Sequence, residues 1–389
     1  MDGGVRVSCH REIEHAGRVR TLIVKTTRLC TSNCAYCDVV SRKKPGPSSM
    51  SDDVAKNLLQ RVAEYLRAKP DDAITWIWHG GEPLLLPKAF YRKVLESIRE
   101  QYADVSDRLH FDMQSNLMVM DREWAELLQD MGLTSIGSSY DPEPGIRGPG
   151  ESRRSDIYNK AFLRGMRIAE DAGLSVGIIY VVTKKSLANP LELFRHLTNL
   201  RPDGALKFNP VLLPENRFPE LRITPEEYAD FLGAVFAEWW PNRQRYSKID
   251  PFQTLVQCII EKDTNGLVCV DSGICAHTHA SISLDGRIAQ CGRSDDWDVM
   301  SYGNIRECSL LDAFESPLRL EMKERYGSLR AGECSDCRFW DICHGGCPLD
   351  SLQSRGHFKA RSPWSAAQRR FIEEYFEPIT GICFQSVTS

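Results

Sequence analysis

Residues 30–39 read CTSNCAYCDV and follow the β-branched run TLIVKTT of residues 21–27. Three cysteines, Cys30, Cys34 and Cys37, therefore lie on one short loop after an expected strand. A tetrahedral zinc site takes four ligands, whereas a [4Fe–4S] cluster held by three cysteines keeps one iron free to bind something else. The spacing leaves both interpretations open, and the rest of the chain decides between them.

Composition limits the classes of protein to consider. The 389 residues suffice for a barrel-sized domain of roughly 250 residues and a smaller second domain. A net charge of −4 gives no general field to attract phosphate backbones, so nucleic acid is not an expected partner. The N-terminus has no apolar signal-peptide core, and no stretch approaches about 18 apolar residues. We therefore expect a cytoplasmic protein with no membrane partner.

The cysteine count indicates metal binding. In a reducing compartment, 14 cysteines are more typical of metal ligands than of disulfides. Most of them fall into recognisable ligand patterns. Cys9, Cys258 and Cys308 fall outside these patterns and are expected to be small buried hydrophobic residues.

Short apolar strands alternate with amphipathic helical segments over the first half of the chain. This alternation is typical of repeated βαβ units around a parallel sheet. One expected helix is capped by Ser51, and a capping box at Thr224 begins another. The expected strands are 21–26, 73–78, 109–113, 135–139, 175–182 and 205–209. They fit a partial (β/α)6 barrel, a full barrel or an open sheet, because periodicity does not distinguish these.

Polar residues follow the second, third and fourth expected strands at their carboxyl ends, where parallel α/β folds gather their chemistry. The second strand leads into His79-Gly80-Gly81-Glu82-Pro83. The glycines allow backbone to approach a ligand closely, and Glu82 offers an acceptor for an ammonium group. The third and fourth strands end in QSN (114–116) and SSYD (138–141). Each motif taken alone is also compatible with a simple capped turn.

The cysteine loop, with the aromatic Tyr36 before its third cysteine, and the downstream Gly80-Gly81-Glu82 resemble motifs of the radical S-adenosylmethionine (SAM) enzymes. The resemblance implies an α/β fold, the partial (β/α)6 barrel. It also implies that the free iron chelates the amino and carboxylate groups of SAM. An electron from the cluster then cleaves the sulfonium to a 5′-deoxyadenosyl radical, which takes a hydrogen atom from the substrate.

The resemblance further implies which residues contact SAM. An arginine after the fourth strand often pairs with the SAM carboxylate in this family. Arg147, Arg153 and Arg154 are the candidates, of which we assign Arg153; a solvated charge run is the alternative. The implied SAM contacts are Tyr36, Gly80, Gly81, Glu82, Gln114, Asn116, Ser139, Asp141 and Arg153.

From Cys269 onward helical periodicity weakens and cysteine becomes frequent, which indicates a second domain. Residues 281–289 are typical of a hairpin around Asp285-Gly286. The pattern C-x9–15-G-x4-C, then C-x2-C-x5-C-x3-C, then a last C, resembles the SPASM domain of radical SAM maturases. One or two zinc ribbons are the alternative. The expected domains are an N-terminal extension (1–20), a radical SAM barrel (21–240), a linker helix (241–268) and the SPASM domain (269–389).

The SPASM resemblance implies two auxiliary clusters, so that three [4Fe–4S] clusters and SAM are the expected cofactors. We assign Cys269, Cys275, Cys291 and Cys347 to auxiliary cluster I, and Cys334, Cys337, Cys343 and Cys383 to auxiliary cluster II. If Cys269 points elsewhere, auxiliary cluster I has an open iron at which a substrate can bind. Thiolate-held clusters span about −700 to +450 mV and suit electron transfer, so a flavodoxin- or ferredoxin-type protein is the expected reductant. Simple polar scaffolding of the substrate pocket is the alternative role.

The motifs resemble those of maturases that modify peptides or proteins. Our leading hypothesis is oxidation of a ribosomally made peptide by a C–C or thioether crosslink or a similar reaction at an unactivated C–H bond. Sulfatase maturation is second, because those enzymes carry a catalytic aspartate where this chain has Gly292. Asp295 and Asp296 are substitute candidates, and exposed loop acids are the alternative.

Leader-peptide recognition is expected from a separate protein or from the barrel mouth, because few residues precede the first strand. Two non-maturase classes are also considered. Oxidation of a small alcohol or amino sugar is disfavoured by the complete set of auxiliary cysteines. A non-catalytic iron–sulfur carrier is disfavoured by the three-cysteine loop and the Gly80-Gly81-Glu82 motif.

Overall fold

A curved sheet of parallel strands forms the first part of the chain. The computed structural model describes residues 21–41, 46–201, 204–213, 217–246, 248–267, 269 and 271–384. The strands expected from the sequence are confirmed as β1 Thr21–Thr27, β2 Ile74–Gly80, β3 Leu109–Met113, β4 Ser135–Ser139, β5 Ser175–Val182 and β6 Leu206–Pro210. β2 runs two residues beyond its expected end, into the glycine motif.

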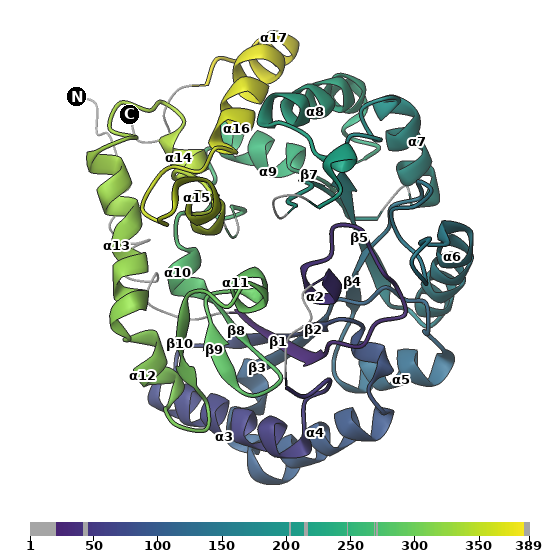
Figure 1. Ribbon diagram of the computed structural model, residues 1–389, viewed down its shortest axis with the longest axis vertical. Coiled ribbons are helices and arrows are strands. Elements are labelled where there is room, and N and C mark those ends of the chain that lie inside the picture. Colours follow the sequence, from purple (N-terminus) through teal and green to yellow (C-terminus); the bar gives the residue numbers. More distant parts are fainter. Residues whose placement is uncertain are drawn as a thin grey trace, which may run out of the picture.

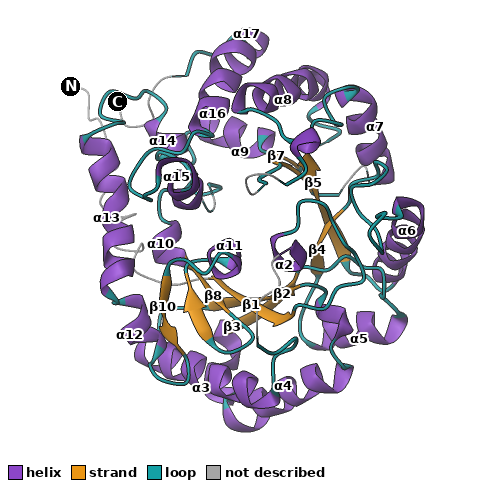
Figure 2. Cartoon of the chain, viewed as in Figure 1, coloured by secondary structure: helices purple, strands orange, loops and turns teal. Residues whose placement is uncertain are grey.

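The strands lie in an arc with the helices on its outer side (Figures 1 and 2). β1, β2 and β3 pair in parallel, as do β4, β5 and β6. A single parallel bridge between Gln114 and Gly137 joins the two sets. The α/β fold and the partial barrel predicted from the sequence are therefore confirmed.

Alternating burial shows which side chains face the helices and which face the barrel interior. Ile74, Trp76 and Trp78 of β2 are fully buried. Ile77 and His79, at the alternate positions of the strand, are half-buried. Since successive side chains of a strand point to opposite faces, the half-buried set lines the barrel interior. The interior is therefore where a bound molecule can lie.

The outer helices follow the expected pattern. Ser51 caps α3, and its Oγ accepts a hydrogen bond from the Val54 amide at 3.2 Å. The capping box at Thr224 is also present at the start of α8. The helices of this ring are α3 Asp52–Ala68, α4 Lys88–Gln101, α5 Arg122–Asp130, α6 Ser155–Asp171, α7 Pro190–Leu200 and α8 Pro225–Trp239.

The segment 241–268, expected to be a linker helix, is only partly helical. A two-residue strand, β7 Ile249–Asp250, pairs in parallel with β6 and extends the sheet. The short helix α9 Phe252–Val256 follows and continues as a π-helical turn, Gln257–Glu261. Pairing β7 with β6 covers backbone groups that an edge strand leaves unpaired.

The cysteine-rich part of the chain adds strands to the other edge of the barrel sheet. The predicted hairpin around Asp285-Gly286 is confirmed as β8 His279–Ile282 and β9 Arg287–Ala289, and β10 Ser301–Asn304 pairs with β9. β8 also pairs in parallel with β1, which sequence analysis did not foresee. The two regions therefore share one continuous sheet.

Short helices complete this region: α10 Cys275–Thr278, α11 Gly292–Asp296, α12 Leu310–Phe314, α13 Pro317–Ala331, α14 Trp340–Cys343, α15 Pro348–Arg355, α16 Ser365–Phe371 and α17 Glu377–Thr380. Of the two outlying cysteines in described parts of the chain, Cys258 is buried and Cys308 half-buried; Cys9 lies outside the described residues. None of the helices described is both long enough and apolar enough to span a membrane.

Candidate active site and iron–sulfur sites

The cysteine loop begins where β1 ends and is held by backbone hydrogen bonds from two sides. The Glu82 amide donates to the Leu29 carbonyl at 2.8 Å. Further along the loop, the Ala35 amide donates to the Ile146 carbonyl at 3.0 Å. The segments after β2 and β4 therefore fix the loop that carries Cys30, Cys34 and Cys37, before the short helix α2 Asp38–Ser41.

The two glycines after β2 are required by the close approach of this loop. A Cβ on Gly80, whose φ is +134°, would lie 2.4 Å from the Thr27 carbonyl oxygen. A Cβ on Gly81 would lie 2.3 Å from the Leu29 carbonyl oxygen. Sequence analysis assigned the glycines to the approach of a ligand. The structure shows that they first allow the backbone before Cys30 to approach.

Glu82 is fully buried and anchors the end of β3. Its Oε1 accepts hydrogen bonds from the Leu84 amide at 3.0 Å and the Ser115 hydroxyl at 2.8 Å, and its Oε2 accepts one from the Asn116 amide at 2.7 Å. Burial raises the pKa of Glu82 to about 7, and the hydrogen bonds oppose this rise. Three protein donors thus bind the carboxyl group that was assigned to the SAM ammonium, and Glu82 stays a predicted SAM contact.

The polar strand ends meet beside the cysteine loop. Asn116 Nδ2 lies 3.6 Å from the Cys30 sulfur and donates to the Thr31 hydroxyl at 3.0 Å. Gln114 Nε2 donates to the Ser139 hydroxyl at 3.3 Å. The structure thus brings together the SAM contacts predicted on β3 and β4.

A buried charge network joins the loop to the end of β4. Arg147 forms an ion pair with Asp141, and the Tyr36 hydroxyl hydrogen-bonds to both. Arg147 Nη1 also lies 3.6 Å from the Cys34 sulfur. Sequence analysis named Arg147 as a candidate but chose Arg153. Of the three candidate arginines, Arg147 is the one that contacts a cysteine of the loop.

Arg153 lies further from the loop but still acts on it. Its guanidinium carbon is 4.4 Å from the centre of the Phe218 ring, and its charge lowers the pKa of Cys34 against the larger effect of burial and alongside Arg147. Arg153 Nε is buried and has no hydrogen-bond partner among the described residues. Arg153 stays a predicted SAM contact, and Arg154 is exposed.

The thiols of the loop are suited to iron rather than to a free thiolate. Burial raises the pKa of Cys30 to about 12 and also raises that of Cys34. Such thiols stay protonated at neutral pH unless a metal ion supplies positive charge, because a coordinating thiol is deprotonated outright. The donor set therefore fits an iron–sulfur cluster at Cys30, Cys34 and Cys37.

The cysteines assigned to auxiliary cluster I are electrostatic neighbours in the structure: the thiol of Cys269 is acted on by Cys275, Cys347 and Cys291. Cys291 and Cys347 occupy the N-terminal cap positions of α11 and α15. The Tyr326 hydroxyl lies 3.2 Å from the Cys275 sulfur, which is within hydrogen-bond range. The sequence analysis did not identify Tyr326, because its position on a helix gives no indication that its hydroxyl lies next to a sulfur atom.

Two buried arginines support an anionic group at this position. Arg319 and Arg325 of α13 are fully buried, and both act on the Cys275 thiol. Neither forms an ion pair with a carboxylate in the described part of the chain, and Arg319 Nε and Nη1 have no hydrogen-bond partner there. Buried unpaired cations are costly. An iron–sulfur cluster held by four thiolates is anionic and would offset that cost.

The site assigned to auxiliary cluster II is a cavity of about 210 Å³. Cys334, Cys337 and Cys343 line it. Cys383 is exposed and is not among its lining residues, although the Phe384 ring stacks on Phe339 at 5.5 Å. The assignment of Cys383 as the fourth ligand stays a prediction.

Comparison with known families agrees with this geometry. Residues 24–197 match the model of the radical SAM superfamily, and residues 274–338 match the SPASM model, described as an iron–sulfur cluster-binding domain. The chain belongs to the radical SAM superfamily and carries a SPASM domain. These two domains imply [4Fe–4S] clusters and SAM as cofactors.

Several relatives of this chain are anaerobic sulfatase-maturating enzymes. The chain is 26% identical to the serine-type anaerobic sulfatase-maturating enzyme of Klebsiella aerogenes, over 82% of this chain and 77% of the relative. It is 24% identical to the cysteine-type enzyme of Clostridium perfringens, over 84% and 88%. These relatives therefore indicate the radical SAM/SPASM maturase family.

Solved structures confirm the fold. The structure of native anSMEcpe with bound AdoMet has a TM-score of 0.77 at 22% identity, covering 93% of this chain and 98% of that one. The structure of SuiB from Streptococcus suis bound to S-adenosylmethionine has a TM-score of 0.59 at 13% identity, covering 90% and 79%. At these identities the likeness concerns the fold alone.

The Gly81→Ala variant should lose iron from the loop cluster, because its Cβ would displace the backbone just before Cys30. Iron content and the EPR signal of the reduced protein measure this loss. Gly327→Ala is the matched control, since a Cβ at Gly327 in α13 meets nothing within 4 Å. Equal iron content in the Gly81→Ala variant and the control would contradict the close-approach argument.

Arg147 and Arg153 should differ when each is replaced by methionine. Arg147→Met leaves the buried Asp141 unpaired and should lower the free energy of unfolding of the apo-protein by about 3–5 kcal/mol. Arg153→Met removes an aromatic contact worth under about 1 kcal/mol and should mainly weaken SAM binding. Urea unfolding and equilibrium dialysis with SAM separate the two effects. Unchanged SAM binding in Arg153→Met would remove Arg153 from the SAM contacts.

Proposed function

We propose that this chain is a radical SAM/SPASM maturase that oxidises a C–H bond in a peptide or protein. The observation that carries this proposal is the sheet shared by the two domains. Because β8 pairs with β1, helix α11, which follows Cys291, packs against helix α2, which follows Cys37. The helices that follow ligands assigned to two different clusters are therefore in contact with each other in one barrel.

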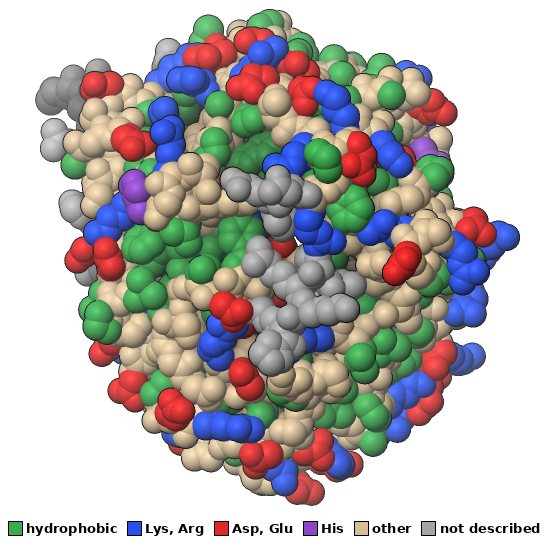
Figure 3. Space-filling view, viewed as in Figure 1, with side chains coloured by type: hydrophobic (Ala, Val, Ile, Leu, Met, Phe, Trp, Pro, Cys, Tyr) green, Lys and Arg blue, Asp and Glu red, His purple; other side chains and the backbone are tan. Residues whose placement is uncertain are grey.

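Three [4Fe–4S] clusters and SAM, held by the cysteines assigned above, would supply the radical and the one-electron chemistry when bound. The chain itself forms the barrel interior in which a substrate would bind. Polar side chains face the barrel interior, among them the buried Lys25 and the half-buried Lys207. Figure 3 shows hydrophobic side chains gathered beside the hollow at the barrel mouth, with charged side chains of both signs around it. A mixed lining of this kind suits a peptide, which carries both apolar and polar groups.

The product of the leading hypothesis is a crosslinked or similarly oxidised ribosomal peptide. Formylglycine in a sulfatase is the second candidate, and the two maturating enzymes compared above favour it because they align over most of this chain. Gly292 is the feature that separates the two candidates, since no carboxylate stands at that position. Oxidation to formylglycine by this chain therefore needs another proton acceptor.

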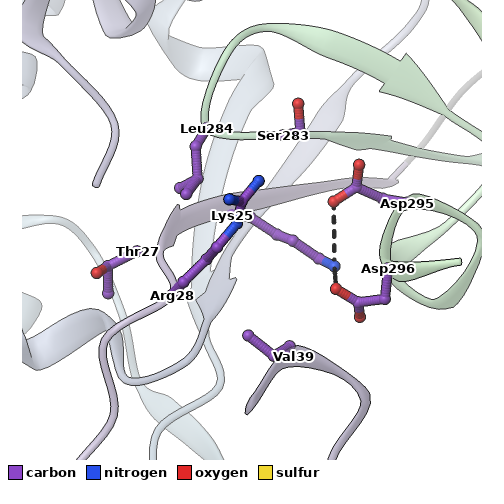
Figure 4. Close-up of a pocket in the computed structure, with 8 residues that line it drawn as sticks. All are labelled: Lys25, Thr27, Arg28, Val39, Ser283, Leu284, Asp295 and Asp296. Carbon is purple, nitrogen blue, oxygen red and sulfur yellow. Dashed lines mark hydrogen bonds and ion pairs between the residues drawn. The ribbon is translucent and has the colours of Figure 1, made fainter. Parts of the chain in front are cut away.

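Lys25 and two aspartates of α11 line a small pocket next to Gly292 (Figure 4). Lys25 Nζ donates to the Gly292 carbonyl at 2.8 Å and forms ion pairs with Asp296 and, at 3.1 Å, with Asp295. Asp295 is also held by Arg287 at 2.5 Å. Both acids named in the sequence analysis are thus paired and well buried, which excludes the simple exposed-loop alternative.

Asp296 is the better proton acceptor of the two acids. Its side chain is 14% exposed, against 7% for Asp295, and the only ion pair it forms in the described part of the chain is with Lys25. Burial raises the pKa of Asp296, and Lys25 opposes that rise. A carboxylate with a raised pKa takes up a proton more readily than an ordinary aspartate does. We therefore assign the base role to Asp296.

The reaction class is tested with anaerobically reconstituted protein, dithionite and SAM. The wild-type protein should form 5′-deoxyadenosine, and Cys34→Ala should form none. Cys258→Ala is the control, because Cys258 is a buried cysteine outside the ligand patterns. A wild-type preparation that binds zinc instead of iron, or that leaves SAM intact, would refute the proposed function.

The product class is tested with two sets of peptides. Sulfatase-derived peptides with serine or cysteine at the reactive position test the second candidate. Short peptides encoded beside the gene test the first. Mass spectrometry should show a loss of two hydrogens in a crosslinked peptide or in an oxidised serine peptide. An oxidised cysteine peptide should lose two hydrogens and exchange its sulfur for a water oxygen. A hydrazide probe should label an aldehyde but not a crosslink. Modification of neither set in an enzyme that cleaves SAM would argue against both candidates.

Asp296→Asn should lower the yield of oxidised product by about 100-fold or more while 5′-deoxyadenosine still forms, because only proton removal is lost. Asp295→Asn is the matched control on the same helix. It should keep the ratio of product to 5′-deoxyadenosine, since Asp295 is held by two cations. Equal effects of the two variants on this ratio would show that the acids act only in packing α11 against β1.

A further inference from the structure

Three arginines surround the cavity that Cys334, Cys337 and Cys343 line. Arg355 ends α15, Arg361 lies in the loop that follows, and Arg369 lies on α16; all three line the cavity and are exposed. None of them forms an ion pair with any residue that the structure describes. The charged face formed by Arg355, Arg361 and Arg369 is here called the arginine rim.

Neighbouring basic residues behave differently. Arg338 pairs with Glu373 and Glu377, and Lys359 pairs with Glu321. One carboxylate lies beside the rim: Glu333 accepts a hydrogen bond from the Arg361 backbone amide at 3.1 Å. The described carboxylates form no ion pair with the three rim side chains, so the rim keeps a net positive charge. Three unpaired cations around one opening produce a local positive potential that attracts negatively charged molecules.

The rim lies close to the cysteines inside. Arg355, Arg361 and Arg369 line the same cavity as three of the cysteines assigned to auxiliary cluster II. The cysteines of this cavity are buried or half-buried, whereas the rim side chains are exposed, so the cavity opens to the protein surface at the rim.

We propose that the arginine rim is the docking surface for a small acidic one-electron carrier of the flavodoxin type. The inference rests on the proposed function, because it requires an iron–sulfur cluster at Cys334, Cys337 and Cys343. Electron-transfer complexes bury little surface and depend on complementary charge for orientation and encounter rate. An exposed positive rim around a cluster site provides both the charge and the short distance that such a partner needs.

The test compares two electron sources in one variant. Arg355, Arg361 and Arg369 are replaced together by glutamate, and 5′-deoxyadenosine formation is measured with a reduced bacterial flavodoxin and with dithionite. At low salt the flavodoxin-driven rate should fall about tenfold or more, as expected when electrostatic steering is lost. The dithionite-driven rate, the iron content and the EPR spectrum should not change.

The matched control reverses the same amount of charge elsewhere. Lys56, Arg99 and Arg167 lie on α3, α4 and α6, are exposed, and form no ion pair with described residues. Their joint replacement by glutamate should leave both rates at the wild-type level. If both triple variants slow the flavodoxin-driven reaction equally, net charge rather than the rim is responsible and the proposal is refuted.

Binding gives a second readout that does not depend on turnover. Titration calorimetry should show flavodoxin binding to the wild-type protein that weakens as salt rises, and weaker binding to the rim variant. Should the glutamate variant lose iron, the triple replacement by glutamine is used, which removes charge without reversing it. Equal affinity of the wild type and the rim variant for flavodoxin would overturn the proposal. Polyglutamate, an acidic polymer, serves as a competitor for the rim. If it displaces flavodoxin without slowing electron delivery, the rim is not the site of electron delivery and the proposal is also overturned. A wild-type protein inactive with dithionite would instead count against the proposed function.

Discussion

The parallel pairing of β1 with strands on both sides is the constraint on which the site depends. Ile23 pairs with Ile77 of β2 on one side and with Ser281 of β8 on the other. Because all three strands run the same way, their carboxyl ends open at one edge. The cysteine loop and the glycine motif follow these ends of β1 and β2, whereas β8 turns back through the antiparallel strand β9 before Cys291. A strand order without β8 beside β1 would separate the two sets of cysteines.

Buried charge is distributed unevenly around the sites. The pair formed by Arg147 and Asp141 beside the cysteine loop is compensated within the protein, as is Lys25 with its two aspartates. Arg319 and Arg325 have no carboxylate partner among the described residues. A buried cation without a partner is tolerated where a bound group brings the opposite charge. The environment of Cys275 is therefore suited to an anionic cluster, whereas the loop site depends less on one.

Sequence patterns predicted the local elements of secondary structure and missed the pairing of segments that lie far apart in the chain. The strands and the hairpin at Asp285-Gly286 follow from alternation and turn chemistry, so they were correctly placed. The pairing of β8 with β1 joins segments far apart in the chain and leaves no periodic signal. The two-residue strand β7 is too short for any periodicity. Arg147 was not selected over Arg153 because the irregular loop after β4 decides which arginine turns inward, and spacing does not reveal that geometry.

The position of Lys25 shows how one strand residue changes the chemistry available in the barrel. Lys25 faces the interior from β1, and a Cβ at Gly292 would lie 3.8 Å from its Cε, an ordinary van der Waals distance. The Gly292 carbonyl accepts from Lys25 Nζ, while the carboxylates one helical turn later pair with the same ammonium. Glycine and lysine at these two positions are thus one coupled arrangement. It holds the two aspartates of α11 against β1, and α11 in turn contacts the helix that follows Cys37.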